Sequence, residues 1–206
     1  MLTTNEISRA TNYVEELRIF THGLKIPSDD KIRAAASCFA IAQDHHQAIV
    51  RLIEYQLFAS VFSLVRIEFE AYIRGEWLSQ CASDKLVIAF LKGIEPPRID
   101  CMIEQLEKLE PFNENILSQI KQKNWRSMCA FTHTGGLHVL LWNTEDGIEP
   151  NYIKEDVIKM LNFAEIIASL AALAVAGLAG NKKLAVRILK ALKRQHTVCE
   201  NTVNAC

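Results

Sequence analysis

Two residues suited to phosphodiester cleavage lie seven positions apart in the segment WRSMCAFTHTGG, residues 125–136. The guanidinium of Arg126 would hold phosphate oxygens bidentately and stabilise developing charge. An imidazole titrates near neutrality, so His133 would take a 2′-hydroxyl proton or protonate a leaving oxygen. If one helix spans the segment, the two side chains project within about 20° of each other. This pattern predicts metal-free cleavage of RNA to a 2′,3′-cyclic phosphate.

Two glycines follow this pair and extend the hypothesis. Gly135 and Gly136 have no side chains, so their backbone amides would approach a phosphate closely. A structural interpretation stays open, in which a helix ends here, His133 caps its last carbonyls and the glycines turn the chain.

A second charged group lies in the segment VRIEFEAYIRGEWL, residues 65–78, which is apolar nearly all round as a helix and is therefore predicted to be buried. Arg66, Glu70 and Arg74 follow one another at four-residue steps, so Glu70 can bridge both arginines. Buried ionic groups must pair or line a cavity. The group is either a structural clamp or a polar pocket with an arginine left over for an anion.

His46 lies in the apolar seam of a predicted helix over 29–58. It is interpreted either as a core histidine or as a residue that faces Arg66 and Glu70 across a helix contact. The adjacent His45 points about 100° away, so the two cannot comfortably share one ion. The six cysteines form no CxxC motif and have no histidine at zinc-finger spacing. We therefore expect free thiols, no metal site and no cofactor.

The last predicted helix, 182–196, carries six lysines and arginines and no acid. Such a helix can grip RNA phosphates or an acidic partner. The alternative is a solvated C-terminal helix whose cations suit its dipole.

Apolar residues recur at three- and four-residue steps along nearly the whole chain, which predicts an all-α protein. Expected helices cover about 5–20, 29–58, 61–81, 85–92, 95–109, 114–132, 152–179 and 182–196. Ser28 and Asn151 are the expected N-caps of the two long helices. Residues 133–151 are expected to be irregular, and 197–206 to form a frayed tail. The prediction is a single domain over 1–206, an antiparallel bundle of seven or eight helices with a core over about 5–180.

The apolar helix over 152–179 is expected to be central to this bundle. Ala168, Ala172, Ala176 and Gly180 form a ridge of small residues that lets a neighbouring backbone approach. The neighbour is either another helix of the same core or a dimer partner. Residues 166–180 are uncharged, but fifteen helical residues reach only about 22 Å, too short to span a bilayer.

Composition limits the function classes. Hydrophobic residues make up 50% of the 206, and 8 glycines with 5 prolines are too few turn formers for a β-sandwich. The net charge of −1 excludes a globally basic nucleic-acid binder, although not a local basic patch. The N-terminus has no apolar signal core. We expect a soluble, cytoplasmic protein with no membrane span.

The blocks DHHQAIVRLIE (44–54), VRIEFEAYIRGEWLSQCA (65–82) and WRSMCAFTHTGG resemble an uncharacterised family of bacterial all-helical proteins. A helical bundle with arginine, six residues and then histidine also resembles, more distantly, the HEPN domains. Many of these are metal-independent RNases of toxin–antitoxin and antiphage systems, in which the motifs of two identical chains line one cleft. This resemblance implies an HEPN-like homodimer in which Arg126 and His133 are catalytic. Arg66, Glu70 and Arg74 would then be an auxiliary site, or the polar centre that His133 alone joins.

The leading hypothesis is thus an HEPN-like endoribonuclease of a toxin–antitoxin or phage-defence system, with an RNA substrate. One alternative is a non-catalytic interaction or immunity protein with a cognate partner. Another is a nucleotide- or anion-binding module that uses Arg66, Glu70 and Arg74.

Overall fold

The computed structural model describes the backbone of residues 1–203 and the side chains of residues 1–196 except Pro111. Within that part of the chain all regular elements are helical, which confirms the predicted all-α class. The elements are α1 (Thr4–Thr21), α2 (Asp30–Glu54), α3 (Phe58–Gln80), α4 (Asp84–Leu91), α5 (Ile99–Leu106), a 3₁₀ turn (Glu110–Phe112), α6 (Ile116–Thr132), α7 (Gly136–Leu140), α8 (Lys154–Leu178) and α9 (Lys182–Val203).

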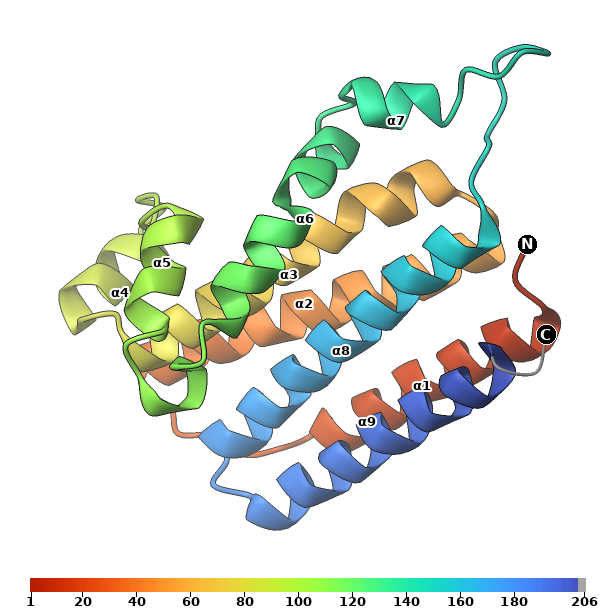
Figure 1. The fold of residues 1–206 in the computed structure, drawn as a ribbon. Helices are drawn as coiled ribbons and strands as arrows, with labels where there is room; N and C mark the ends of the chain where they lie inside the picture. The colour runs from red at the N-terminus through yellow and green to blue at the C-terminus, as the bar shows by residue number, and fades with distance from the viewer. Residues whose placement is uncertain (204–206) are drawn as a thin grey trace.

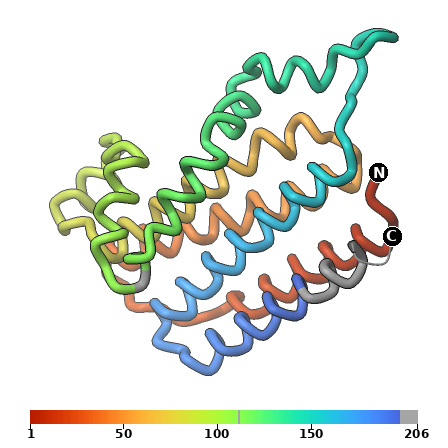
Figure 2. Tube along the Cα trace, viewed as in Figure 1, coloured from red at the N-terminus to blue at the C-terminus, as the bar shows by residue number. Residues whose placement is uncertain are grey.

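The helices form a bundle around α8 (Figures 1 and 2). Helices α1 and α9 lie side by side along one flank, and the hairpin of α2 and α3 packs on the other side of α8. Helix α6 runs along α3, while α4 and α5 close one end. The short α7 and the loop after it extend beyond the bundle.

Three clusters of buried apolar side chains hold these helices together. The first joins α2 and α3 to α4, α5 and α8; the second joins the other halves of α2 and α3 to α6 and the start of α8; the third joins α1, α8 and α9. Representative members are Phe39, Phe69 and Trp77 in the first, Ile49, Phe62 and Leu161 in the second, and Tyr13, Ala172 and Ile188 in the third.

The predicted ridge of small residues on α8 is part of the third cluster. Ala168, Ala172 and Ala176 are fully buried together with apolar residues of α1 and α9. The neighbour that approaches them is therefore another part of the same chain. Gly180 does not extend the ridge, because it follows the end of α8 with φ +62°.

Helices α2 and α3 pass so closely at Gly75 that an added Cβ would lie 2.5 Å from Cε1 of the buried Phe39 ring. We therefore predict that Gly75→Ala lowers the free energy of unfolding by about 1–3 kcal/mol, even though alanine is the better helix former. Urea denaturation measures this change. The matched control is Gly177→Ala on α8, where the Cβ meets open space and a gain of about 0.5–1 kcal/mol is expected. Equal stability of Gly75→Ala and the parent would contradict the close approach.

One fully buried titratable residue separates the first and second clusters on each central helix: His46 on α2, Glu68 on α3 and Glu165 on α8. Glu165 Oε1 accepts a hydrogen bond from Gln195 Nε2 at 2.8 Å, and its other oxygen has no partner among the described residues. Neither oxygen of Glu68 has a described partner. Burial raises the pKa of Glu68 well above its ordinary value and that of Glu165 to about 7. Burial thus disfavours the charged form of both carboxyls.

Two of the expected helix starts are wrong. Asp29, not Ser28, is the N-cap of α2, because its backbone is extended and its side chain accepts from Ile32 N at 2.9 Å. Helix α8 begins after Ile153 without a side-chain cap. Asn151 instead donates its backbone N–H to the carbonyl of Leu141 at 2.8 Å and so closes the preceding loop.

Other boundaries differ by a few residues. Helix α2 ends at Glu54 rather than Phe58, because Gln56 turns the chain with φ 59° and Phe58 already begins α3. The region 133–151 is not wholly irregular, since it contains α7. The expected frayed tail is helical through Val203, and 204–206 lie outside the described residues.

Helix α8 is long and apolar enough to cross a membrane by length and composition, alone among the described helices. Half of its most apolar window is buried inside the bundle, as in a core helix. The arrangement is compatible with a soluble protein.

Candidate functional site

Three charged residues lie along one face of α3, where the four-residue steps place them one turn apart. Arg66 Nε donates to Glu70 Oε1 at 2.7 Å, and Arg74 Nη2 lies 3.8 Å from Glu70 Oε2. Their side chains are only 17%, 23% and 29% exposed for Arg66, Glu70 and Arg74. Glu70 thus bridges both arginines, as the spacing predicts. Two guanidiniums against one carboxylate leave a net positive charge that favours an anion.

His133 joins this group from the end of α6. Its Nε2 lies 2.8 Å from Arg66 Nη1. A guanidinium only donates, so Nε2 must accept, and the imidazole is neutral with its proton on Nδ1. We call Arg66, Glu70, Arg74 and His133 the Arg66 cluster. Of the alternatives expected from the sequence, this matches the one in which His133, without Arg126, joins the three charged residues of α3.

The end of α6 is held against α3, which explains this contact. Ser63 Oγ on α3 lies 2.9 Å from the carbonyl oxygen of Phe131. Phe131 also packs edge-on against Phe62. The next residues of α6 therefore reach Arg66, one turn further along α3.

Trp125 and Lys121 of α6 complete the surroundings of Arg66. The guanidinium carbon of Arg66 and the ammonium of Lys121 each lie 4.5 Å from the centre of the Trp125 ring. Lys121 also pairs with Asp100 of α5 at 2.5 Å. The ring is covered by two cations, so it positions them rather than offering a free face to a base. Neither residue was predicted from the sequence, although a lysine four positions before a tryptophan indicates a shared helix face.

No hydrogen bond or ion pair joins Arg126 to His133. Arg126 is exposed, and no such contact joins it to any other described residue. The expectation that both project from one face assumed an uninterrupted helix, but α6 ends at Thr132. His133 is the C-cap residue (φ −110°), and its side chain contacts Arg66 of α3.

Of the two glycines after His133, Gly135 does not offer its amide to a phosphate. The Gly135 amide donates to the carbonyl of Ala130 at 2.7 Å, so it is already used. A Cβ at Gly135 would lie 3.0 Å from Ala130 Cα, so glycine is needed here for close packing. Gly136 begins α7 and has open space around it. The structural interpretation of these glycines, a turn at a helix end, is the one observed.

Thr134 carries the strain of this turn. It adopts φ 53°, a left-handed conformation that is unfavourable for a β-branched residue. We predict that Thr134→Gly raises the free energy of unfolding by about 1 kcal/mol, because glycine adopts this conformation freely. Thermal denaturation measures the change, and Thr134→Val, which keeps the branched shape, is the matched control. Destabilisation by glycine would show that the Thr134 conformation carries no strain.

A hydrogen-bonded chain that the sequence analysis did not find fixes the segment after His133. The Trp142 indole donates to Tyr152 Oη, which lies 3.0 Å from His138 Nε2, and His138 Nδ1 lies 2.9 Å from the Phe131 carbonyl. A carbonyl only accepts and an indole only donates, so His138 Nδ1 donates to Phe131 and the Trp142 indole donates to Tyr152. His138 is 7% exposed. The chain ties α7 and the start of α8 to the end of α6.

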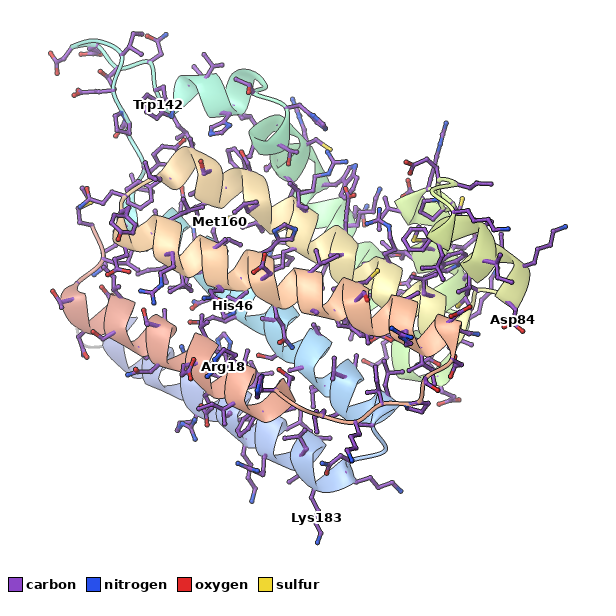
Figure 3. All side chains as sticks on the ribbon, turned by 180° about the vertical axis from the view of Figure 1, so that it is seen from behind. Arg18, His46, Asp84, Trp142, Met160 and Lys183 are labelled. Atoms are coloured by element: carbon purple, nitrogen blue, oxygen red, sulfur yellow. The ribbon has the colours of Figure 1, made fainter. Side chains whose placement is uncertain are left out.

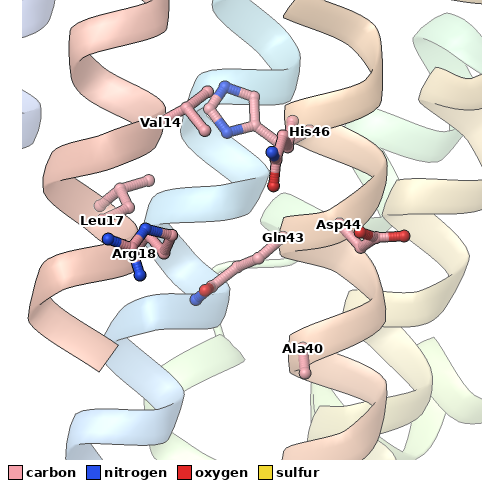
Figure 4. Close-up of a pocket in the computed structure, with 8 residues that line it drawn as sticks. Val14, Leu17, Arg18, Ala40, Gln43, Asp44 and His46 are labelled. Carbon is pink, nitrogen blue, oxygen red and sulfur yellow. The ribbon is translucent and has the colours of Figure 1, made fainter. Parts of the chain in front are cut away.

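His46 lies apart from the Arg66 cluster. Its ring packs edge-on against Tyr13 of α1, with ring centres 6.5 Å apart, and is 1% exposed. Figure 3 shows it on α2 with Arg18 of α1 nearby, and Figure 4 shows residues that line the adjoining cavity between these two helices. The volume of this cavity is about 190 Å³. Burial lowers the pKa of His46 to about 4. It is therefore a neutral core histidine, and the suggested contact with Arg66 and Glu70 is not present.

Within the part of the chain that the structure describes, no group of three or more histidine, cysteine, aspartate or glutamate side chains could hold a metal ion. The free thiols among the described residues are Cys38, Cys81, Cys101 and Cys129.

These features define an all-α bundle with a half-buried arginine–histidine cluster between two of its helices. The chain belongs to a family of unknown function, DUF6988, which residues 39–201 match. This range contains the whole Arg66 cluster and agrees with the expected membership of an uncharacterised family. No curated protein and no solved structure matches the chain.

Proposed function

We propose that the chain is a metal-independent endoribonuclease whose centre is the Arg66 cluster. The observation that carries the proposal is the 2.8 Å contact between Arg66 Nη1 and His133 Nε2, which puts an anion-binding group beside a proton-transfer group. The chemistry is the one expected from the sequence, but Arg66 replaces Arg126 as the guanidinium beside the imidazole.

Substrate binding starts from the donors that the cluster leaves free. Of the five N–H groups of Arg66, the Nε–H is used by Glu70 and one Nη1–H by His133. The others, together with Arg74, would bind the oxygens of an RNA phosphate. Glu70 accepts from both arginines, so its task is to orient them rather than to act as a base.

Proton transfer follows from the tautomer of His133. As Arg66 turns to the phosphate, the Nε2 lone pair becomes free and takes the proton of the 2′-hydroxyl. The 2′-oxygen attacks phosphorus, the bond to the 5′-oxygen breaks, and that oxygen takes a proton from solvent. The products are a 2′,3′-cyclic phosphate and a 5′-hydroxyl. The guanidiniums supply the charge that stabilises the transition state.

The setting of this activity is part of the same proposal. An HEPN-like RNase of a toxin–antitoxin or antiphage system would act in the cytoplasm, as a homodimer, on cellular or phage RNA. Arg126, exposed on the outer side of α6, would contact a flanking phosphate. A cognate antitoxin would be its partner protein.

A second candidate function is binding of a nucleotide or small anion without cleavage. The looseness of the Arg74–Glu70 pair, 3.8 Å against 2.7 Å for Arg66, favours it because Arg74 keeps most of its donors. A nucleotide that binds the folded chain would raise its Tm, and Arg74→Ala would remove that rise.

The experiment that tests the proposed function is incubation of single-stranded RNA with the purified chain in excess EDTA. We expect fragments with 2′,3′-cyclic phosphate ends by mass spectrometry, and no cleavage of the same sequence made with 2′-deoxynucleotides. His133→Gln, purified identically, should cleave about 10²–10⁴-fold more slowly. Intact RNA, loss of cleavage in EDTA, or full activity of His133→Gln would each overturn the proposal.

A further inference from the structure

An exposed apolar and acidic segment extends from the bundle after α6. We call residues 134–153, which comprise α7 and the following loop, the arm (Figure 1). It carries Glu145, Asp146 and Glu149 and has no lysine or arginine. Its exposed apolar side chains are Leu137, Val139, Leu140, Trp142, Ile148 and Ile153, of which Ile148 is 78% and Leu140 63% exposed. Apolar residues gathered in this way indicate a protein interface.

The outer face of α9 has the complementary character. Residues 182–196 carry six lysines and arginines and no acid. Val186 and Leu189, 51% and 44% exposed, lie among the exposed Lys182, Lys183 and Lys190. This face therefore offers apolar contact flanked by positive charge, as the arm offers apolar contact flanked by negative charge.

The arm and this face lie on opposite sides of the molecule. Figure 1 places α7 at one side of the bundle and α9 at the other, and Figure 3, seen from behind, shows Trp142 and Lys183 toward opposite ends of the molecule. The arm therefore cannot cover α9 of its own chain. We infer that the arm of one copy docks on the α9 face of a second copy.

The α9 face fits the arm better than the Arg66 cluster does. The cluster has Glu70 as an internal counter-ion, and its Trp125 ring is covered by Arg66 and Lys121. On α9, no ion pair neutralises Lys183 or Lys190 within the described residues. Charge complementarity and uncovered apolar side chains coincide at the α9 face.

Such a contact is heterologous, because two different surfaces meet. Each copy then presents one further arm or α9 face, so the copies form a closed ring or an open chain. The arm is small compared with a standard interface, so the association should be weak and weakened by salt. It is independent of the proposed nuclease activity.

Sedimentation velocity across a concentration series at low and high salt tests the contact. We expect self-association of the parent at low salt that decreases at about 1 M NaCl. Glu145→Lys with Asp146→Lys should remove this salt-sensitive part of the association, and so should Lys183→Glu with Lys190→Glu, each raising the Kd of the arm–α9 contact by about tenfold or more. These side chains are exposed, and circular dichroism should confirm an unchanged fold.

The decisive step mixes the two charge-reversed variants. Because each carries the surface that the other has lost, the mixture should regain the salt-sensitive association that neither variant shows alone. Arg126→Glu, a reversal outside both surfaces, is the matched control and should associate like the parent. Three results would overturn the inference. The parent could be monomeric at every concentration, the charge reversals on the arm and on α9 could leave its association unchanged, or Arg126→Glu could abolish the association.

Discussion

Replacing Arg66 with alanine is expected to lower kcat/KM for RNA cleavage by about 10²–10³-fold. The guanidinium contacts Glu70, His133 and the Trp125 ring at once. Its loss removes the main phosphate donor and leaves the imidazole without the group that orients it. Few other single substitutions on this surface disturb both parts of the proposed chemistry.

Arg126→Ala is the matched control, because it removes an equal charge from the neighbouring surface of α6. Since Arg126 makes no described contact with His133, we expect its loss to lower kcat/KM by less than about tenfold. Initial rates on a fluorogenic RNA in EDTA measure both variants. If Arg126→Ala lowered kcat/KM more than Arg66→Ala, the catalytic pair would be Arg126 and His133. The Arg66 cluster would then be excluded as the catalytic centre.

The second large effect is on stability. We expect Glu68→Leu to raise the free energy of unfolding by about 1–4 kcal/mol at pH 8, because a buried carboxyl without a described partner is exchanged for an apolar side chain. At pH 5, where Glu68 is neutral in the fold, the gain should be much smaller.

The buried titratable groups determine whether the free energy of unfolding rises or falls with pH. Burial raises the pKa values of Glu68, Glu76 and Glu165, the last two to about 7. The stability from each neutral carboxyl is complete below the ordinary glutamate pKa and is lost as pH rises through the raised value. His46, whose pKa burial lowers to about 4, contributes stability above the ordinary imidazole pKa that is lost as pH falls. The three glutamates act in one direction and His46 in the other. We therefore expect the free energy of unfolding to fall as pH rises from about 5 to 8.

Chemical denaturation of the parent and Glu68→Leu at several pH values between 5 and 8 measures this difference. Glu95→Gln, at an exposed position, is the control and should follow the parent within about 0.5 kcal/mol. A Glu68→Leu variant that is less stable than the parent at pH 8 would mean that the carboxyl has a bonding partner in solution.

Periodicity was enough to predict the fold class, because the apolar stripes of α1, α2, α3 and α8 are long and uninterrupted. Helix ends were less predictable because they depend on single hydrogen bonds. Asp29 accepts from Ile32, whereas Ser28, an equally good cap by type, lies one position too early. The burial of Glu68 was not predictable either, since a local pattern does not show which face of a wholly apolar helix meets the core.

Only the part of the site that lies within α3 could be predicted from the sequence. The four-residue steps of Arg66, Glu70 and Arg74 act within one helix, so sequence spacing alone gives their contact. The contact of His133 with Arg66 joins residues 67 positions apart and depends on where α6 ends. Spacing along α6 pointed to Arg126 because it assumed that the helix continued through His133.

A double-mutant cycle on RNA cleavage tests the central claim most directly. The kcat/KM values of Arg66→Ala, His133→Ala and the double variant are compared with that of the parent in EDTA. If the two side chains form one functional unit, the double variant should be about as active as the weaker single variant. Losses that multiply, or single variants as active as the parent, would contradict a shared site.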